Sequence, residues 1–320
     1  MQRIAVLTSG GDAPGMNAAI RAVVRKAIYH GLEVIGINRG YSGFIEADMG
    51  PMNLGSVADI VHRGGTMLHS ARSEEFLSAG GRARAWENVK RFGVQGLVVI
   101  GGDGSFRGAK IFHEEYGIPV AGVPGTIDND IPGTDFSIGF DTAVNTALDA
   151  INKIRDTATS HERTFVIEVM GRESGAIALS AGLAGGAESI LIPEMPVNID
   201  LIVEKIRRGY RRGKLHSIIV VAEGAAGGME VAREIRDRTG FDTKVTILGH
   251  LQRGGTPSAL DRIMASRMGA KAVELLMANE RKKMVGVVSG YLKATDLDEI
   301  VNSRPGIDLE LFSLADILSI

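Results

Sequence analysis

The sequence contains no cysteine among its 320 residues, which excludes disulfide bonds, thiolate catalysis and zinc sites built on cysteine. A large excess of charge of either sign is also missing. There are 36 Lys and Arg against 38 Asp and Glu, so no broad basic field attracts nucleic acid or an anionic membrane. We therefore expect no nucleic-acid and no membrane partner, although a local basic pocket is compatible with this balance.

Long apolar runs are missing as well. No run approaches the roughly 20 residues of a membrane-spanning helix, and no Asn-x-Ser/Thr sequon occurs. The first residues enter a strand-like segment directly, with no signal peptide ahead of it. These features together predict a cytoplasmic protein.

What is present is an alternation of short apolar runs and helical segments along a chain about twice as long as a typical domain. This rhythm predicts an α/β protein of two domains with mostly parallel sheets, and the 42 glycines suit many strand-to-helix turns. The expected strands are residues 4–7, 34–37, 97–100, 120–123, 164–169, 189–192, 217–222, 245–248 and 285–288. Helices are expected over 16–30, from about 143 to 159 with Asp141 or Thr142 as N-cap, from about 199, and over 258–278 and 309–319.

Three expected strands in the first half end in loops rich in glycine and aspartate. These loops are Gly10–Gly15, Gly101–Ser105 and Pro124–Asp130. Ligands bind at the carboxyl ends of parallel strands, where glycines let backbone N–H groups approach an anion and carboxylates hold Mg²⁺ or accept a proton. The combination indicates phosphoryl transfer; each loop alone is also compatible with a tight turn carrying solvated aspartates.

Loops in the second half place charged groups after strands in the same way. They are Met170-Gly171-Arg172, Glu223-Gly224 and the stretch from Gly249 through His250 to Arg253. A His and an Arg in one glycine loop could bind a phosphorylated sugar. On the expected helix 16–30, Arg21 and Arg25 share a face, which is either simply solvated or a phosphate-binding pair.

Taken together, these six loops resemble the bacterial ATP-dependent 6-phosphofructokinase family, in one order from Ile4 to the C-terminus. The resemblance implies two doubly wound, mostly parallel domains with the active site in the cleft between them. Residues 1–138 with about 252–303 would bind ATP, and residues 139–251 with about 304–320 would bind fructose 6-phosphate.

The family reaction transfers the γ-phosphoryl group of Mg-ATP to the 1-hydroxyl of fructose 6-phosphate. By resemblance, Asp128 is the catalytic base, Thr126 and Arg172 steady the transferring group, and Asp103 binds Mg²⁺ with Asp130 nearby. The implied ATP-binding residues are Gly11, Arg72, Ser73, Gly102, Asp103, Gly104 and Ser105. The implied sugar-phosphate residues are Thr126, Asp128, Arg163, Met170, Gly171, Arg172, Glu223, Lys244, His250 and Arg253.

The resemblance also implies a homotetramer in which Arg163 and Lys244 complete the site of a neighbouring subunit. It implies a separate effector site for ADP and phosphoenolpyruvate at another subunit interface. The matching positions are Arg21, Arg25, Arg155, Gly186, Glu188, Arg212 and Lys214.

Two positions depart from the family pattern. Lys244 stands where Arg is usual, and a Lys lacks the planar fork that grips a phosphate; Glu173 follows Arg172 where well-known members have His. Gly104 and Gly125 favour ATP over pyrophosphate, because pyrophosphate-using relatives carry Asp and Lys there. The alternatives are a pyrophosphate-dependent enzyme, a non-catalytic nucleotide sensor and a Rossmann dehydrogenase, the last disfavoured by the missing GxGxxG motif.

Overall fold

The computed structural model describes residues 1–303 and 305–319, and the chain divides into two compact units. The first unit comprises Met1–Asp141 and the segment that starts at Arg253. The second comprises Thr142–Gln252 and the segment that starts at Gly306. The chain passes from one unit to the other in α5 (Phe140–His161), in the short helix η2 (Gly249–Arg253) and again after Pro305.

The sheet of the first unit has seven strands in the order β11-β10-β5-β4-β1-β2-β3. Its five inner strands are parallel and confirm the five strands predicted for this part of the chain: β1 (Arg3–Ser9), β2 (Glu33–Ile37), β4 (Leu97–Gly101), β5 (Val120–Pro124) and β10 (Lys283–Val288). The two edge strands, β3 (Met49–Met52) and β11 (Tyr291–Asp296), are antiparallel to their neighbours and were missed by the sequence reasoning.

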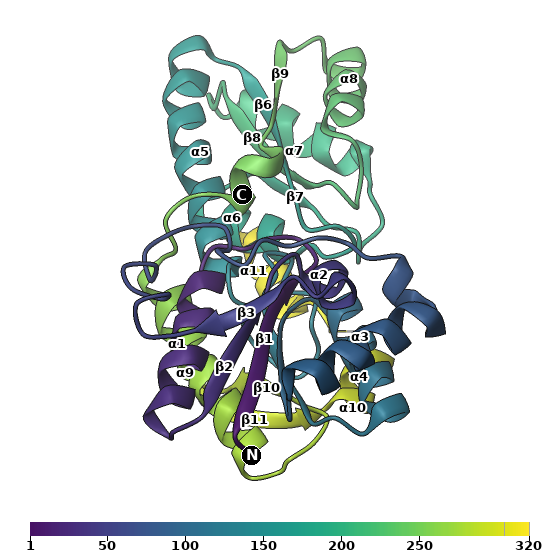
Figure 1. The fold of residues 1–320 in the computed structure, drawn as a ribbon. Helices are drawn as coiled ribbons and strands as arrows, with labels where there is room; N and C mark the ends of the chain where they lie inside the picture. The colour runs from purple at the N-terminus through teal and green to yellow at the C-terminus, as the bar shows by residue number, and fades with distance from the viewer. Residues whose placement is uncertain (304, 320) are drawn as a thin grey trace. The chain divides into compact units, whose positions relative to one another are not determined.

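Helices cover both faces of this sheet (Figure 1). On one face α1 (Met16–Tyr29) packs against α9 (Ala259–Met277). On the other lie α2 (Gly40–Glu46), η1 (Glu75–Leu77), α3 (Ala79–Phe92), α4 (Asp103–Tyr116) and α10 (Leu297–Asn302), around a core that includes Phe44, Phe76, Phe106 and Phe112. The central strands are buried on both sides, which explains why they are apolar throughout.

The second unit has a four-stranded, all-parallel sheet in the order β7-β8-β6-β9. The strands are β7 (Ser189–Leu191), β8 (Ser217–Ala222), β6 (Thr164–Val169) and β9 (Thr243–Ile247), and they confirm the remaining four predictions. α7 (Ile199–Arg211) and α8 (Gly228–Thr239) pack on one face, while α6 (Ala176–Ala184) and α11 (Leu309–Leu318) lie on the other. The predicted N-cap of α5 was wrong: the helix begins at Phe140, so Asp141 and Thr142 lie in its first turn.

No helix in residues 1–303 and 305–319 combines the length and the apolar character needed to cross a membrane.

A largely buried ion pair ties α3 to α4. The Arg82 guanidinium donates to both carboxylate oxygens of Glu115, at 2.7 and 2.6 Å, and also to the carbonyl oxygens of Phe76 and Leu77. The Arg82 side chain is only 10% exposed. These hydrogen bonds hold the pKa of Glu115 below its ordinary value.

We expect Arg82→Met to lower the free energy of unfolding at pH 7 by about 2–3 kcal/mol, because it leaves Glu115 and two carbonyl groups without their donor. A carboxylate whose pKa is lowered in the folded state stabilises that state above its unfolded pKa, and the contribution disappears as the pH falls through the folded pKa. The difference in the free energy of unfolding between variant and wild type should therefore have its full size above about pH 5 and shrink at lower pH. Urea unfolding at several pH values measures it.

Lys153→Met is the matched control. Lys153 pairs with Asp149 on the exposed side of α5, where both side chains are largely in water, so this change should cost less than about 0.5 kcal/mol. An equal loss in both variants would contradict the role assigned to the Arg82–Glu115 pair.

Candidate active site

The loops that follow β1, β4 and β5 start side by side in the first unit. Ser9, Gly101 and Pro124 are the last residues of these three strands. Strand pairing aligns Ser9 with Gly101 and Gly101 with Pro124. The chain leaves β1 toward β2 on one side, while β4 lies on the other, so this is a topological switch point of the sheet. In open α/β sheets, such a point is where ligands bind.

The N-terminus of α4 opens into free space at this position. α4 begins at Asp103 with Gly102 as its N-cap, and no side chain caps its first N–H groups. A Cβ atom added at Gly104 would meet no atom within 4 Å. A 14-residue helix that presents free N–H groups to an open space attracts anions such as phosphate. The predicted ATP-binding residues Gly102, Asp103 and Gly104 therefore lie at a helix N-terminus that suits an anion.

A buried tyrosine, Tyr41, fixes the first turn of α4. Burial raises the pKa of Tyr41 well above its ordinary value, so the phenol stays protonated. Its hydroxyl donates to the backbone carbonyl of Ser105 at 2.6 Å. This contact fixes the first turn of α4, with Ser105 itself buried.

Asp103 is the candidate metal ligand, and its carboxylate pairs with the Arg107 guanidinium one turn later at 2.9 Å. Within the part of the chain that the structure describes, no three His, Cys, Asp or Glu side chains cluster as a metal cage. Mg²⁺ in phosphoryl-transfer sites is commonly held by one or two carboxylates together with the substrate phosphates. A single carboxylate beside an anion-binding helix N-terminus fits a metal that arrives with the nucleotide.

Asp128 lies in a loop that is fixed by its own hydrogen bonds. Asp128 is 1% exposed, and its N–H donates to the Thr126 hydroxyl at 3.2 Å. Asn129 adopts a left-handed backbone with φ of 50° and accepts a hydrogen bond from the Ser137 N–H at 2.8 Å. The Ser137 hydroxyl in turn donates to the Thr126 carbonyl at 2.7 Å. The loop thus holds one buried carboxylate beside the predicted nucleotide loops.

The two glycines used to argue for ATP differ in their surroundings. Gly104 borders open space. A Cβ at Gly125, however, would lie 3.2 Å from the side chains of Ile100 and Met16. A side chain at Gly125 would therefore crowd apolar neighbours, and its direction leads into the core and not into open space.

Gly11 packs against a predicted sugar-phosphate residue. A Cβ at Gly11 would lie 2.0 Å from Arg253 Nη1, so the Gly11 backbone lies beside the Arg253 guanidinium in the first unit. Arg72, by contrast, is an exposed residue ahead of η1, and the Ser73 hydroxyl accepts from the Phe76 N–H. Both Arg72 and Ser73 stay predictions as ATP-binding residues.

In the second unit, Glu223 clamps the turn after β6. One carboxylate oxygen of Glu223 accepts from the N–H groups of Gly171 and Arg172, at 3.2 and 2.9 Å. Arg172 has a φ of 52°, a conformation that non-glycine residues rarely adopt. Such strain persists only where neighbours impose it, and it is common at functional sites. Glu223 therefore positions the exposed Arg172 and leaves its second oxygen for other partners.

Gln252 supports the same turn and was missed by the sequence reasoning. It is fully buried, and its side-chain oxygen accepts from the Met170 N–H at 2.8 Å. Gln252 lies between His250 and Arg253 in the sequence, and this position inside the motif is the one feature by which the sequence could have identified it. The contact joins the η2 loop, which carries the exposed His250, to the Met170–Arg172 turn.

Arg163 and Lys244 share one counter-ion. Asp242 pairs with Arg163 Nε at 2.7 Å and with Lys244 Nζ at 2.9 Å, so the two predicted phosphate-binding cations lie together. Hydrogen bonding to Lys244, with the nearby charge of Arg163, holds the pKa of Asp242 below its ordinary value. Asp242 had no recognisable motif and could not be found from the sequence.

Four of the predicted effector residues gather at one end of β7 and β8. Arg155 donates to the carbonyl oxygens of Gly185 and Gly186, while Lys214 pairs with the buried Glu188. Burial lowers the pKa of the neighbouring His216, assisted by the charges of Lys214 and Arg155. His216 was not predicted. Arg212 lies exposed at the end of α7, and Arg21 and Arg25 lie on α1 in the first unit.

Comparison with known proteins places this arrangement in a family. The family model described as Phosphofructokinase matches residues 3–276. The ATP-dependent 6-phosphofructokinase of Halalkalibacterium halodurans is 60% identical over 320 residues, and that of Bacillus subtilis is 58% identical; each alignment covers both chains completely.

Solved structures agree. The phosphofructokinase of Saccharomyces cerevisiae superposes with a TM-score of 0.91 at 36% identity, covering 99% of this chain and 47% of that one. A pyrophosphate-dependent phosphofructokinase from Marinobacter aquaeolei superposes with a TM-score of 0.86 at 25% identity, covering 97% and 86%. The resemblance predicted from the six loops is thus confirmed: the chain belongs to the phosphofructokinase family and matches bacterial members named ATP-dependent over its full length.

Proposed function

We propose that this chain transfers the γ-phosphoryl group of ATP to the 1-hydroxyl of fructose 6-phosphate, giving fructose 1,6-bisphosphate and ADP in glycolysis. The observation that carries this proposal is the 60% identity over the whole length of a relative named ATP-dependent 6-phosphofructokinase. The buried Asp128 beside the open N-terminus of α4 supports the same chemistry. The first unit would bind ATP, and the second would bind most of the sugar phosphate.

In this reaction Asp128 accepts the proton of the attacking hydroxyl, since a positioned carboxylate is the base that phosphoryl transfer requires. The N-terminus of α4 holds the nucleotide phosphates, with Gly11, Arg72, Ser73 and Ser105 completing the ATP site. Mg²⁺, when bound, neutralises charge on those phosphates, and Asp103 would hold it in place of its pairing with Arg107.

The sugar phosphate would be held by Met170, Gly171 and Arg172, with Glu223, His250 and Arg253 around it. Arg172 and Thr126 would steady the charge that the transferring group develops. Arg163 and Lys244 would bind the 6-phosphate of a neighbouring subunit in a homotetramer.

The experiment that tests the function is phosphoryl transfer to fructose 6-phosphate with Mg-ATP and Mg-pyrophosphate run side by side. We expect fructose 1,6-bisphosphate from ATP only. Product from pyrophosphate would refute the choice of donor. No product from either donor, with ADP still bound, would indicate a nucleotide sensor.

We expect Lys244→Arg to lower the KM for fructose 6-phosphate by about two- to tenfold, because the Arg fork makes two parallel hydrogen bonds to a phosphate where Lys makes a point contact. kcat should change little. Steady-state kinetics with varied fructose 6-phosphate measure the effect. An unchanged KM would show that Lys244, which already shares Asp242 with Arg163, does not limit sugar-phosphate binding.

For regulation, we propose that ADP and phosphoenolpyruvate bind the cluster of Arg155, Gly186, Glu188 and Lys214, together with Arg212 and with Arg21 and Arg25 of a neighbouring subunit. The buried Glu188, which pairs with the exposed Lys214, and the lowered pKa of His216 support a polar pocket there. We place the enzyme in the cytoplasm, in keeping with the glycolytic reaction proposed for it and with its relatives named ATP-dependent 6-phosphofructokinase.

In Arg21→Ala, the concentration of ADP or phosphoenolpyruvate needed for a given change in rate should rise at least tenfold. The reason is that the variant lacks one phosphate contact. The rate without effector should stay within about twofold. Activity titrations with each effector test this. A changed basal rate with an unchanged effector response would contradict the assignment.

A further inference from the structure

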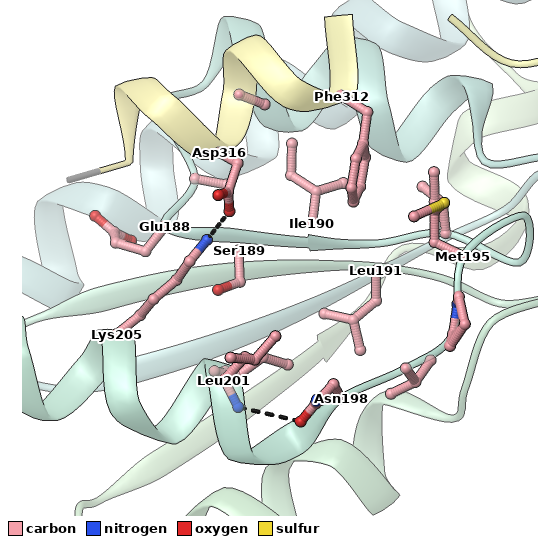
Figure 2. Close-up of a pocket in the computed structure, with 16 residues that line it drawn as sticks. Glu188, Ser189, Ile190, Leu191, Met195, Asn198, Leu201, Lys205, Phe312 and Asp316 are labelled. Atoms are coloured by element: carbon pink, nitrogen blue, oxygen red, sulfur yellow. Dashed lines mark hydrogen bonds and ion pairs between the residues drawn. The ribbon is translucent and has the colours of Figure 1, made fainter. Parts of the chain in front are cut away.

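A cavity of about 290 Å³ lies in the second unit at the free edge of its sheet. It is bounded by β7, by the start of α7 and by α11 (Figure 2). Most of its lining is apolar and includes Ile190, Leu191, Met195, Leu201 and Phe312. A volume of this size approaches the range of sites that hold small organic molecules.

The cavity curves around β7 because that strand has a neighbour on one side only. Successive side chains of a strand point to opposite faces, and Figure 2 shows the consequence. Ser189 and Leu191 point toward Leu201 of α7, whereas Ile190 points toward Phe312 of α11. The cavity is therefore lined by two helices that come from distant parts of the sequence.

The charged groups at its rim are already paired. Lys205 of α7 donates to Asp316 of α11, which closes one side of the cavity, and it lies 3.3 Å from the Ser319 hydroxyl. Glu188 accepts from Lys214 and from the N–H of Ile218. Since these charges have partners, the residues that the structure describes around the cavity offer no free charge to an ionic ligand.

One polar atom in the wall of the cavity, the hydroxyl oxygen of Ser189, has no such partner. Ser189 is 7% exposed, and its buried hydroxyl oxygen makes no hydrogen bond to any described residue. A buried hydroxyl left without a partner costs about 1–3 kcal/mol. A hydroxyl can both donate and accept, so a ligand with either kind of group would relieve that cost.

We propose that this cavity binds a neutral, largely apolar small molecule with one or two rings that carries a hydroxyl or carbonyl group for Ser189. The apolar lining provides the binding surface, and the Ser189 hydroxyl fixes the orientation. The cavity shares Glu188 with the effector cluster but no residue with the proposed substrate sites. It is a site of its own and does not depend on the proposed reaction.

The test uses 2-naphthol, and naphthalene as the analogue without the hydroxyl, with binding to the full-length protein followed by ligand fluorescence and calorimetry. We expect saturable binding of 2-naphthol, which Ser189→Ala weakens about two- to tenfold, the usual worth of one hydrogen bond. Naphthalene should bind more weakly and should not distinguish Ser189→Ala from the wild type.

Ala315→Leu provides a second variant, because Ala315 lines the cavity and a larger side chain would fill part of it. It should reduce the affinity for both probes, with circular dichroism melts showing that each variant is folded. Absence of saturable binding to the wild type would overturn the proposal. Displacement of 2-naphthol by ATP or fructose 6-phosphate, or equal affinity in all variants, would also overturn it.

Discussion

Replacing Asp128 by Ser is expected to lower kcat by about 10²–10⁴, the usual contribution of a positioned general base. The KM for ATP should stay within about twofold. The Ser side chain is smaller than Asp and keeps a hydroxyl in a buried position, so the loop network through Thr126, Asn129 and Ser137 should persist. What is lost is the group that accepts the proton.

The measurement is steady-state kinetics with each substrate varied in turn, together with calorimetric binding of ATP. Asp149→Asn is a suitable control, since Asp149 is an exposed carboxylate on α5 that pairs with Lys153. It should leave kcat unchanged. A loss in Asp128→Ser that arises through KM alone would show that Asp128 binds substrate and is not the base.

The inner strands could be predicted because burial on both faces requires apolar residues throughout. β4 and β5 are buried at every position. The edge strands β3 and β11 could not be found in this way. β3 contains Pro51, which only an edge strand accommodates. In β11, exposed and partly buried residues alternate from Tyr291 to Ala294, the one buried residue is Thr295, and the short antiparallel return after β10 carries no long apolar run.

The site shows the same division between local and long-range information. Strand-end loops such as Gly101–Ser105 are contiguous in the sequence, so their glycines and carboxylates identified them. Asp242, which joins Arg163 to Lys244, and Gln252, which supports Met170, act through contacts between segments about 80 residues apart. Such contacts depend on strand order, which one sequence does not reveal.

The glycine after Glu223 gives the second large effect. A Cβ at Gly224 would lie 1.9 Å from the Arg172 carbonyl oxygen and 3.0 Å from its carbonyl carbon. Both are backbone atoms, so no side-chain rotation can relieve the clash. Gly224→Ala must therefore displace the Gly171–Arg172 turn, which Glu223 holds through two hydrogen bonds.

A displacement of about 1 Å at a catalytic group can cost about 100-fold in rate, so we expect kcat/KM for fructose 6-phosphate to fall at least that far. The KM for ATP should change much less, because the proposed ATP-binding residues lie in the first unit. Enzyme kinetics and a thermal melt on the same preparation separate the loss of activity from any loss of stability.

Gly227→Ala is the matched control from the same loop. A Cβ there would meet no atom within 4 Å, and the φ of Gly227, -73°, suits alanine. The change should cost less than about 1 kcal/mol in stability as an N-cap substitution and leave kcat/KM unchanged. If both variants lost activity equally, the loop after β8 would matter through its flexibility. If only Gly224→Ala did, the close approach of two backbones would be what holds Arg172 in its strained and functional conformation.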